Sequence, residues 1–200
     1  MKNKSYHKFV FDENKRKYIG NFDDMYQFEK TDPWQCSDLS NSVKKIHSAI
    51  LNTYNFNTIL DYGCGKGVFT HTLKKENNKV YGVDISENAI QKAKLAYADK
   101  VNFSTVSEKH WNKRSYDLVV CLEVLSYVKE YKKLLQNFAI KGKFLYLSLY
   151  IPKKPIGFVK NVDGLINYLK MFYSIKIKVI YNDQSIFIFA KSKKYKSIRK

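Results

Sequence analysis

The chain has 200 residues, of which 44% are hydrophobic and 16% aromatic, so it can bury the core of a single globular domain. Its 36 lysine and arginine residues against 18 acidic ones give a formal net charge of +18. No apolar run approaches the roughly 20 residues that a membrane span needs. The three cysteines and four histidines are too scattered to predict a disulfide framework or a metal site.

Residues 1–40 carry aromatic and acidic side chains without clear periodicity, and we expect them to form a cap over the active site. The first eight residues lack the apolar core of a secretory signal, so we expect a cytoplasmic protein. A helix is predicted over residues 40–53, where Val43, Ile46 and Ile50 recur at helical spacing.

A glycine-rich loop follows the first predicted strand. It has the pattern D-x-G-x-G-x-G, with the acid at Asp61 and the glycines at Gly63, Gly65 and Gly67. Glycine has no side chain and adopts positive φ, so the backbone can turn sharply out of the strand and press against a ligand. Helical spacing resumes over residues 68–73, which predicts strand, loop and helix in succession.

Strand, glycine loop and helix also occur in nicotinamide dinucleotide sites, whose pattern is G-x-G-x-x-G. Counted from Gly63 and Gly65, that pattern needs glycine where the chain has Val68. The strand predicted over residues 79–85 ends in Asp84, about 20 residues past the loop, where a carboxylate can bind the hydroxyls of an unphosphorylated ribose. The spacing therefore favours an adenosine cofactor other than a dinucleotide.

The remaining elements alternate along the chain. A helix over residues 86–97 is expected to start at Ser86 as its N-cap. The elements predicted after it are a strand at 101–105, a strand in the apolar run 116–127, a helix at 131–138, a strand at 143–151 and a helix at 162–173. Residues 175–179 and 185–190 flank a turn at 182–184, which predicts a terminal antiparallel hairpin.

The loop pattern, Asp84 and the run Y-D-L-V-V-C-L-E-V-L-S-Y-V that starts at Tyr116 resemble class I S-adenosylmethionine-dependent methyltransferases over most of the chain. The run is especially similar to small-molecule members related to the nodulation N-methyltransferase and sugar amine methyltransferases. The resemblance implies a Rossmann-like α/β fold, with a seven-stranded, mostly parallel sheet, an antiparallel C-terminal hairpin and helices on both faces. It places the catalytic core at residues 41–191, between the cap and a basic tail at 192–200.

The cofactor that the resemblance implies is S-adenosyl-L-methionine, with S-adenosyl-L-homocysteine as its product. The residues expected to bind it lie in the loop, after the second and fourth strands and in the cap: Asp61, Gly63, Cys64, Gly65, Gly67, Asp84, Ile85, Leu122, Tyr26 and Trp34. After the third strand, relatives commonly place an acid that reaches the adenine amine, where this chain has Ser107 and Glu108. We expect Ser107, Glu108 or backbone amides there to replace it.

Methyl transfer from a sulfonium depends mainly on the position of the nucleophile. Good positioning lowers the activation barrier by roughly 7 to 11 kcal/mol, so no single catalytic residue is obligatory. Tyr127 and Glu123 are candidates to orient an amine or hydroxyl, and Glu123 has the alternative role of accepting from buried backbone amides. His110 is the candidate base, because an imidazole titrates near physiological pH.

Only three of the 36 cationic residues are arginine, and the abundance of lysine and asparagine indicates that much of the charge reflects composition. We expect an N- or O-methyltransferase acting on a small anionic or sugar-type metabolite, such as a precursor of a surface polysaccharide. An RNA methyltransferase or RNA-binding relative that uses the basic surface is the alternative, and a noncatalytic relative is the third. The sequence indicates no oligomeric state.

Overall fold

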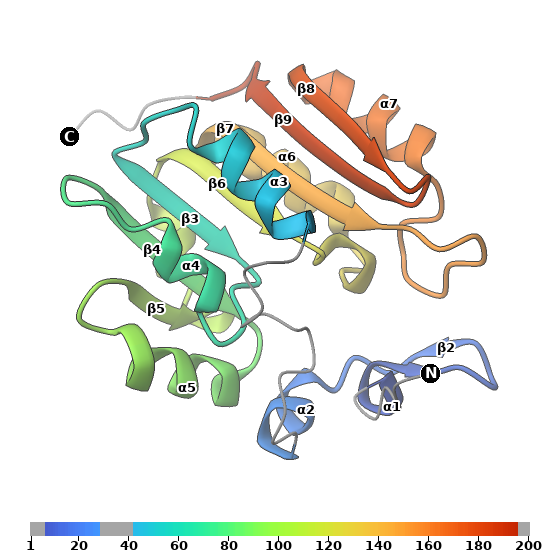
Figure 1. Ribbon diagram of the computed structural model, residues 1–200. Coiled ribbons are helices and arrows are strands. Elements are labelled where there is room, and N and C mark those ends of the chain that lie inside the picture. Colours follow the sequence, from blue (N-terminus) through green and yellow to red (C-terminus); the bar gives the residue numbers. More distant parts are fainter. Residues whose placement is uncertain (1–6, 29–41, 196–200) are drawn as a thin grey trace.

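The computed structural model describes residues 7–28 and 42–195. Its centre is a seven-stranded sheet in the order β5-β4-β3-β6-β7-β9-β8 (Figure 1). The parallel strands are β3 (Thr58–Tyr62), β4 (Lys79–Asp84), β5 (Asn102–Thr105), β6 (Tyr116–Leu122) and β7 (Gly142–Tyr150). In the final hairpin of β8 (Tyr173–Tyr181) and β9 (Ser185–Ser192), β9 lies between β7 and β8 and is antiparallel to both. The predicted fold class is confirmed.

Helices cover both faces of the sheet (Figure 1). On one face lie α3 (Ser42–Leu51), α4 (Val68–Thr72) and α5 (Glu87–Tyr97), and on the other lie α6 (Tyr131–Lys141) and α7 (Val162–Phe172). Because successive side chains of a strand point to opposite faces, Ile59 of β3 joins the core under α3 and α5 while Leu60 joins the core under α6 and α7.

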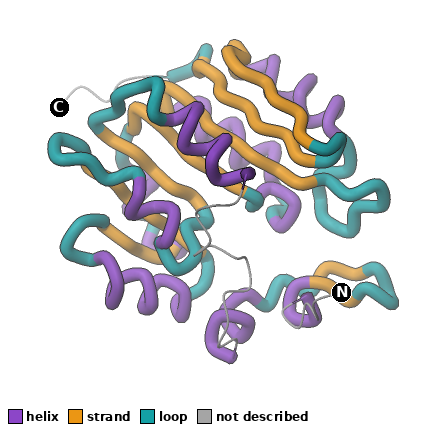
Figure 2. The backbone as a smooth tube through the Cα atoms, viewed as in Figure 1, coloured by secondary structure: helices purple, strands orange, loops and turns teal. Residues whose placement is uncertain are grey.

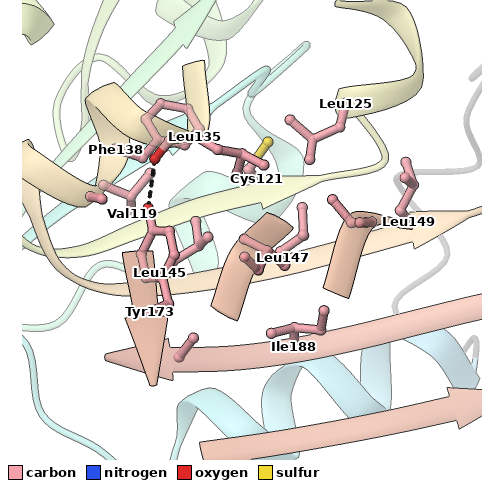
Figure 3. Packing of buried hydrophobic residues seen from close by; sticks show 14 of the residues in the cluster. Val119, Cys121, Leu125, Leu135, Phe138, Leu145, Leu147, Leu149, Tyr173 and Ile188 are labelled. Atoms are coloured by element: carbon pink, nitrogen blue, oxygen red, sulfur yellow. Dashed lines mark hydrogen bonds between the residues drawn. The ribbon is translucent and has the colours of Figure 1, made fainter. Parts of the chain in front are cut away.

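The second of these cores is drawn in Figure 3. Val119 and Cys121 of β6 pack there beside Leu145 of β7, and all three side chains are buried. The hydroxyl of Tyr173 donates to the carbonyl of Leu135 at 3.0 Å, so this buried phenol has the partner that burial demands.

The predicted core elements are present, and their differences from the structure are confined to their ends. Ser86 caps α5 as predicted, because its Oγ accepts from Ala89 N at 3.1 Å. The hairpin turn contains Asn182 and Asp183, both at positive φ, a conformation that these residue types tolerate. Helix α6 continues past its predicted end to Lys141. The first residues of the helix predicted over 40–53 lie outside the described part of the chain.

The described residues before α3, here called the N-terminal segment (residues 7–28), form short elements that the aperiodic sequence did not predict (Figure 2). They are α1 (His7–Val10), β1 (Phe11–Asp12), β2 (Lys17–Tyr18) and α2 (Phe22–Phe28). Helix α2 packs against α5, where Met25 and Tyr26 are buried with Ala89.

The core also contains three short 3₁₀ turns that the sequence did not predict. They are η1 (Val106–Glu108), η2 (His110–Lys113) and η3 (Leu125–Tyr127). The division into cap, core and tail stays a prediction.

Candidate active site

A cavity of about 560 Å³ lies at the carboxyl ends of β3, β4 and β6. The carboxyl ends of parallel strands meet at one edge of the sheet, so residues far apart in the sequence converge there. The described residues that line the cavity are Tyr18, Phe22, Tyr26, Val43, Lys44, His47, Asp61, Tyr62, Gly63, Cys64, Gly65, Lys66, Val68, Phe69, Asp84, Ile85, Val106, Leu122, Glu123, Val124, Tyr127, Val128 and Lys129.

Gly63 and Gly65 of the glycine loop contribute bare backbone to the cavity wall, whereas Gly67, also predicted to bind the cofactor, is not among the lining residues. Gly63, Gly65 and Gly67 have φ of 80°, 54° and 76°, in the left-handed region that other residues avoid. A Cβ on Gly63 would overlap Val124 Cγ2, and one on Gly65 would lie 2.7 Å from the hydroxyl oxygen of Tyr26. The loop therefore packs closely against these two side chains and has no space for a Cβ at either position.

Asp84 is buried behind the loop and ties it to α5. Its Oδ2 accepts from Gly65 N at 2.9 Å, and its Oδ1 accepts from Ser86 N at 2.9 Å. Burial raises the pKa of this carboxyl, while the hydrogen bonds from the Ser86 and Gly65 amides oppose the rise. The Ile85 amide also donates to this carboxyl. A carboxylate has about four acceptor sites, so one remains for a hydroxyl of a ribose.

Asp61 is a second buried acid beside the same cavity. Its Oδ2 accepts from the Thr70 hydroxyl at 2.7 Å. Burial raises the pKa of Asp61 to about 7, the Thr70 hydrogen bond opposes this, and the negative charge of Asp84 adds to it. Because a nearby positive charge favours the ionised form of an acid, this pair fits a cationic ligand.

The structure brings most of the other predicted cofactor residues to the cavity. Tyr26, Cys64 and Leu122 line it, and Ile85 lies at its edge with 71% of its surface exposed. An exposed aliphatic side chain at the end of a strand is a platform for a flat apolar ligand group. Trp34 lies outside the described residues.

Ser107 and His110 are not among the residues that line the cavity. After β5 the chain curls into a capping box, in which Glu108 Oε1 accepts from Thr105 N at 2.8 Å and Ser107 Oγ lies 2.7 Å from Thr105 Oγ1. These contacts direct both side chains back to the strand, and Val106 lines the cavity in their place. His110 follows in η2, where it is exposed.

Glu123 and Tyr127, the other two candidates for catalysis, both line the cavity. Glu123 Oε1 accepts from Ser148 Oγ at 2.7 Å, and its Oε2 accepts from Tyr150 N at 2.6 Å. The second bond corresponds to the alternative role predicted for Glu123, that of accepting from backbone amides. Burial raises the pKa of Glu123, and these two bonds oppose the rise. The ring of Tyr127 packs edge-on against Phe22 of the N-terminal segment, with centroids 5.3 Å apart.

Sequence reasoning missed the wall that α3 and α4 contribute, which includes Lys44, His47 and Phe69. His47 is only 4% exposed, and its Nδ1 lies 2.9 Å from the hydroxyl oxygen of Tyr146. Burial, followed by the charge of Lys44, lowers the pKa of His47 to about 4, so the ring is neutral at pH 7. Helical spacing was the available signal, since it places Val43 and His47 on one face of the predicted helix.

Known proteins resemble this chain in sequence and in fold. Residues 28–147 match the protein family described as a methyltransferase domain. The chain belongs to the class I S-adenosylmethionine-dependent methyltransferases.

Curated relatives of this methyltransferase include the ubiquinone biosynthesis O-methyltransferase of Hydrogenovibrio crunogenus, 38% identical over 79 residues, which are 36% of this chain and 33% of the relative. The enzyme of the same name from a Shewanella species is 26% identical over 155 residues, which are 67% of this chain and 64% of the relative. The methyltransferase chain therefore spans between about a third and two thirds of the length of these relatives.

Solved structures share the fold of this methyltransferase. The N-methyltransferase NodS of Bradyrhizobium japonicum, in complex with S-adenosyl-L-homocysteine, has a TM-score of 0.68 at 17% identity and covers 86% of this chain and 99% of its own. The magnesium protoporphyrin IX methyltransferase ChlM of Synechocystis, with bound S-adenosylmethionine, has a TM-score of 0.58 at 20% identity. The match covers 96% of this chain and 98% of ChlM. At these identities the likeness concerns the fold.

The cavity of this methyltransferase fits the cofactor of its class. Gly63 and Gly65 line the cavity with bare backbone, and the buried acids Asp61 and Asp84 suit a ligand with a positive charge and a ribose. Among residues 7–28 and 42–195, no three His, Cys, Asp or Glu residues cluster as metal ligands. No described helix combines the length and apolar composition that crossing a bilayer requires.

Proposed function

We propose that this methyltransferase transfers the methyl group of S-adenosylmethionine to a nitrogen or oxygen atom of a small anionic or sugar-type metabolite. The observation that supports this is one continuous cavity: the glycine loop and two buried acids form one part, and aromatic side chains from the N-terminal segment and the core form another. When bound, the cofactor supplies a methyl group already activated on a sulfonium.

The residues proposed to hold the cofactor follow from their chemistry. Asp84 would accept from a ribose hydroxyl with its remaining acceptor site, and Asp61 would lie near the positive charge. Lys44 and Lys66 line the same cavity and would attract the carboxylate of the amino acid part. The apolar walls proposed for adenine are Ile85, Val106 and Leu122.

The acceptor is proposed to lie among Tyr18, Phe22 and Tyr127, which line the cavity together. Such flat faces with a polar tip suit a planar ring or the apolar face of a sugar. Lys129, an exposed cation among the lining residues, favours an acceptor that carries negative charge. Precursors of surface polysaccharide meet this description, and the names of the curated relatives add ubiquinone precursors to the acceptors to be tested.

In this arrangement the protein accelerates the reaction mainly by positioning the acceptor atom. Such positioning lowers the activation barrier by roughly 7 to 11 kcal/mol. Tyr127 is proposed to orient the acceptor through its phenol. Glu123 is proposed to hold β7 instead, because Ser148 and Tyr150 already donate to its two oxygens. We do not propose His110 as the base, since it lies outside the cavity lining.

Calorimetry with S-adenosyl-L-homocysteine tests the cofactor assignment. The wild-type protein should bind with micromolar affinity, and Asp84→Ala should bind at least about tenfold more weakly because both the loop contact and the ribose contact are lost. Asp99→Ala, in the exposed turn after α5, is the control. Absence of binding, or equal binding by Asp84→Ala, would contradict the proposal.

Incubation of the protein with labelled cofactor and fractionated metabolites then identifies the acceptor. The +18 net charge favours one alternative, an RNA methyltransferase. RNA as acceptor predicts that turnover falls steeply and log-linearly as salt is raised, because phosphate contacts release counterions. A small acceptor predicts a far weaker dependence. The cytoplasm as the compartment stays a prediction from the sequence.

A further inference from the structure

We propose that Asp23 is a positioning residue for the cofactor, which acts through Ser86 to hold Asp84 in place and to close the N-terminal segment against the glycine loop. The inference rests on the cofactor assignment proposed above. It concerns a residue that touches neither the proposed ribose site nor the reacting atoms, and it is carried by a continuous series of hydrogen bonds.

The first step of the series joins the N-terminal segment to α5. Asp23 Oδ1 accepts from Ser86 Oγ at 2.8 Å and from Asn88 N at 3.0 Å, and its Oδ2 accepts from Asn88 Nδ2 at 2.8 Å. The carboxylate thus lies at the start of an eleven-residue helix, where the unpaired backbone amides favour negative charge. These hydrogen bonds hold the pKa of Asp23 below its usual range, the Asn88 amide contributing most.

The second step joins α5 to the cofactor loop. The backbone N–H of Ser86 donates to Asp84 Oδ1 at 2.9 Å, and Asp84 Oδ2 accepts from Gly65 N at 2.9 Å. The Ser86 hydroxyl donates its one hydrogen bond to Asp23. The Ser86 oxygen therefore accepts from Ala89 N as the helix cap. Removing the Asp23 carboxylate therefore frees the residue whose backbone orients Asp84.

A second contact ties the same helix to the loop. Tyr26, one turn after Asp23 in α2, is 6% exposed, and its hydroxyl lies against the bare backbone of Gly65. Lys92 Nζ donates to the carbonyl of Tyr26, so α2 is attached to α5 at two points. Phe22 and Tyr26 of this helix both line the cavity, so release of α2 would remove part of its wall.

The test compares S-adenosyl-L-homocysteine binding by Asp23→Ala and Asp24→Ala. Asp24 lies on the same helix, but its carboxylate has a local partner, because Asn21 Nδ2 donates to Asp24 Oδ2 at 2.6 Å. We expect Asp23→Ala to raise Kd about tenfold, which corresponds to about 1.4 kcal/mol, and Asp24→Ala to leave Kd unchanged. With an acceptor in hand, KM for the cofactor should rise while kcat at saturation is retained.

Conservative replacement separates positioning from a general loss of structure. Asp23→Asn keeps an oxygen that can accept from Ser86 Oγ and Asn88 N, so it should recover most of the affinity. Hydrogen exchange gives a readout independent of turnover: α2 should lose protection in Asp23→Ala, while β3 and β6 keep theirs. If Asp23→Ala does not fold, Asn88→Ala removes the hydrogen bond from Asn88 Nδ2 to Asp23 while the backbone N–H at position 88 still donates, and it should raise Kd by a smaller factor.

Equal Kd values for wild type and Asp23→Ala, with a wild type that binds, would overturn this inference alone. Equal weakening by Asp24→Ala would also overturn it, because any disturbance of α2 would then suffice. Failure of the wild type to bind would overturn the proposed function, and this inference with it.

Discussion

His47 of α3 and Tyr146 of β7 are joined by a hydrogen bond of 2.9 Å between the imidazole Nδ1 and the phenol oxygen. Both side chains are buried, and their rings pack edge to face with centroids 5.6 Å apart. The pair anchors the helix that lines one side of the cavity to the middle of the sheet. Because the pKa of His47 is lowered to about 4, the anchor depends on pH.

Acidification is expected to remove the contribution of His47 to stability. An unfolded histidine has a pKa of about 6.5, so between pH 6.5 and 4 the unfolded chain binds more protons at this residue and the free energy of unfolding falls as pH falls. The full loss is about 3 kcal/mol. Asp61, whose pKa is raised from 3.8 to about 7, changes the free energy of unfolding in the opposite direction over this whole range. The pH profile of the wild type alone therefore does not isolate His47.

Urea denaturation of His47→Phe at pH 7.5 and 4.5 isolates the effect. The substitution should destabilise at pH 7.5, because Tyr146 loses its partner, and the difference from wild type should shrink by about 2 kcal/mol at pH 4.5. Ser48→Ala, at an exposed position of the same helix that carries no titratable group, is the control, with an equal difference expected at both pH values. An unchanged difference for His47→Phe would contradict the prediction.

Cofactor affinity is expected to rise with pH through about 7. Below that value Asp61 is increasingly protonated, and a neutral acid attracts a cationic ligand less well. Calorimetry with S-adenosylmethionine from pH 6 to 8 should show proton release on binding for the wild type and a flat profile for Asp61→Asn. Asp99→Asn should behave as the wild type, and a pH-independent wild-type affinity would refute the role given to Asp61.

Gly63→Ala is expected to cost about 1 to 3 kcal/mol of unfolding free energy, because alanine is strained at a φ of 80° and its Cβ would overlap Val124. Since Val124 lines the cavity, affinity for S-adenosyl-L-homocysteine should fall as well. Gly164→Ala lies in α7, away from the cavity, and should bind as the wild type. Unimpaired stability and binding in Gly63→Ala would show that a glycine is not required at this position.

Glu123→Gln is expected to impair stability rather than the chemical step. A glutamine can accept from only one of the two donors with its oxygen, which leaves Tyr150 N or Ser148 Oγ poorly paired at a cost of about 1 to 3 kcal/mol. Ser148→Ala removes one donor and should lower the free energy of unfolding by about 1 kcal/mol. A much larger fall in kcat for Glu123→Gln than for Ser148→Ala would instead make Glu123 catalytic.

Features set by neighbouring residues were predicted correctly. The glycine at position 67 rather than 68 separated the loop from a dinucleotide site, and Ser86 caps α5 because a hydroxyl before a helical run accepts from an amide three residues on. The alternation that ends in β9 predicted the antiparallel hairpin. Turns, caps and periodicity depend on φ preferences and side-chain spacing, which are properties of the local sequence.

The sequence by itself therefore determined the sheet, the glycine loop and the acid at the end of β4. Only the tertiary structure decided that Asp23 contacts Ser86, that His47 faces the cavity and that Ser107 turns back to Thr105. A sequence shows which side chains can donate or accept, but partners distant along the chain are selected by how the helices pack on the sheet. That packing depends on the whole core, so spacing alone could not predict these contacts.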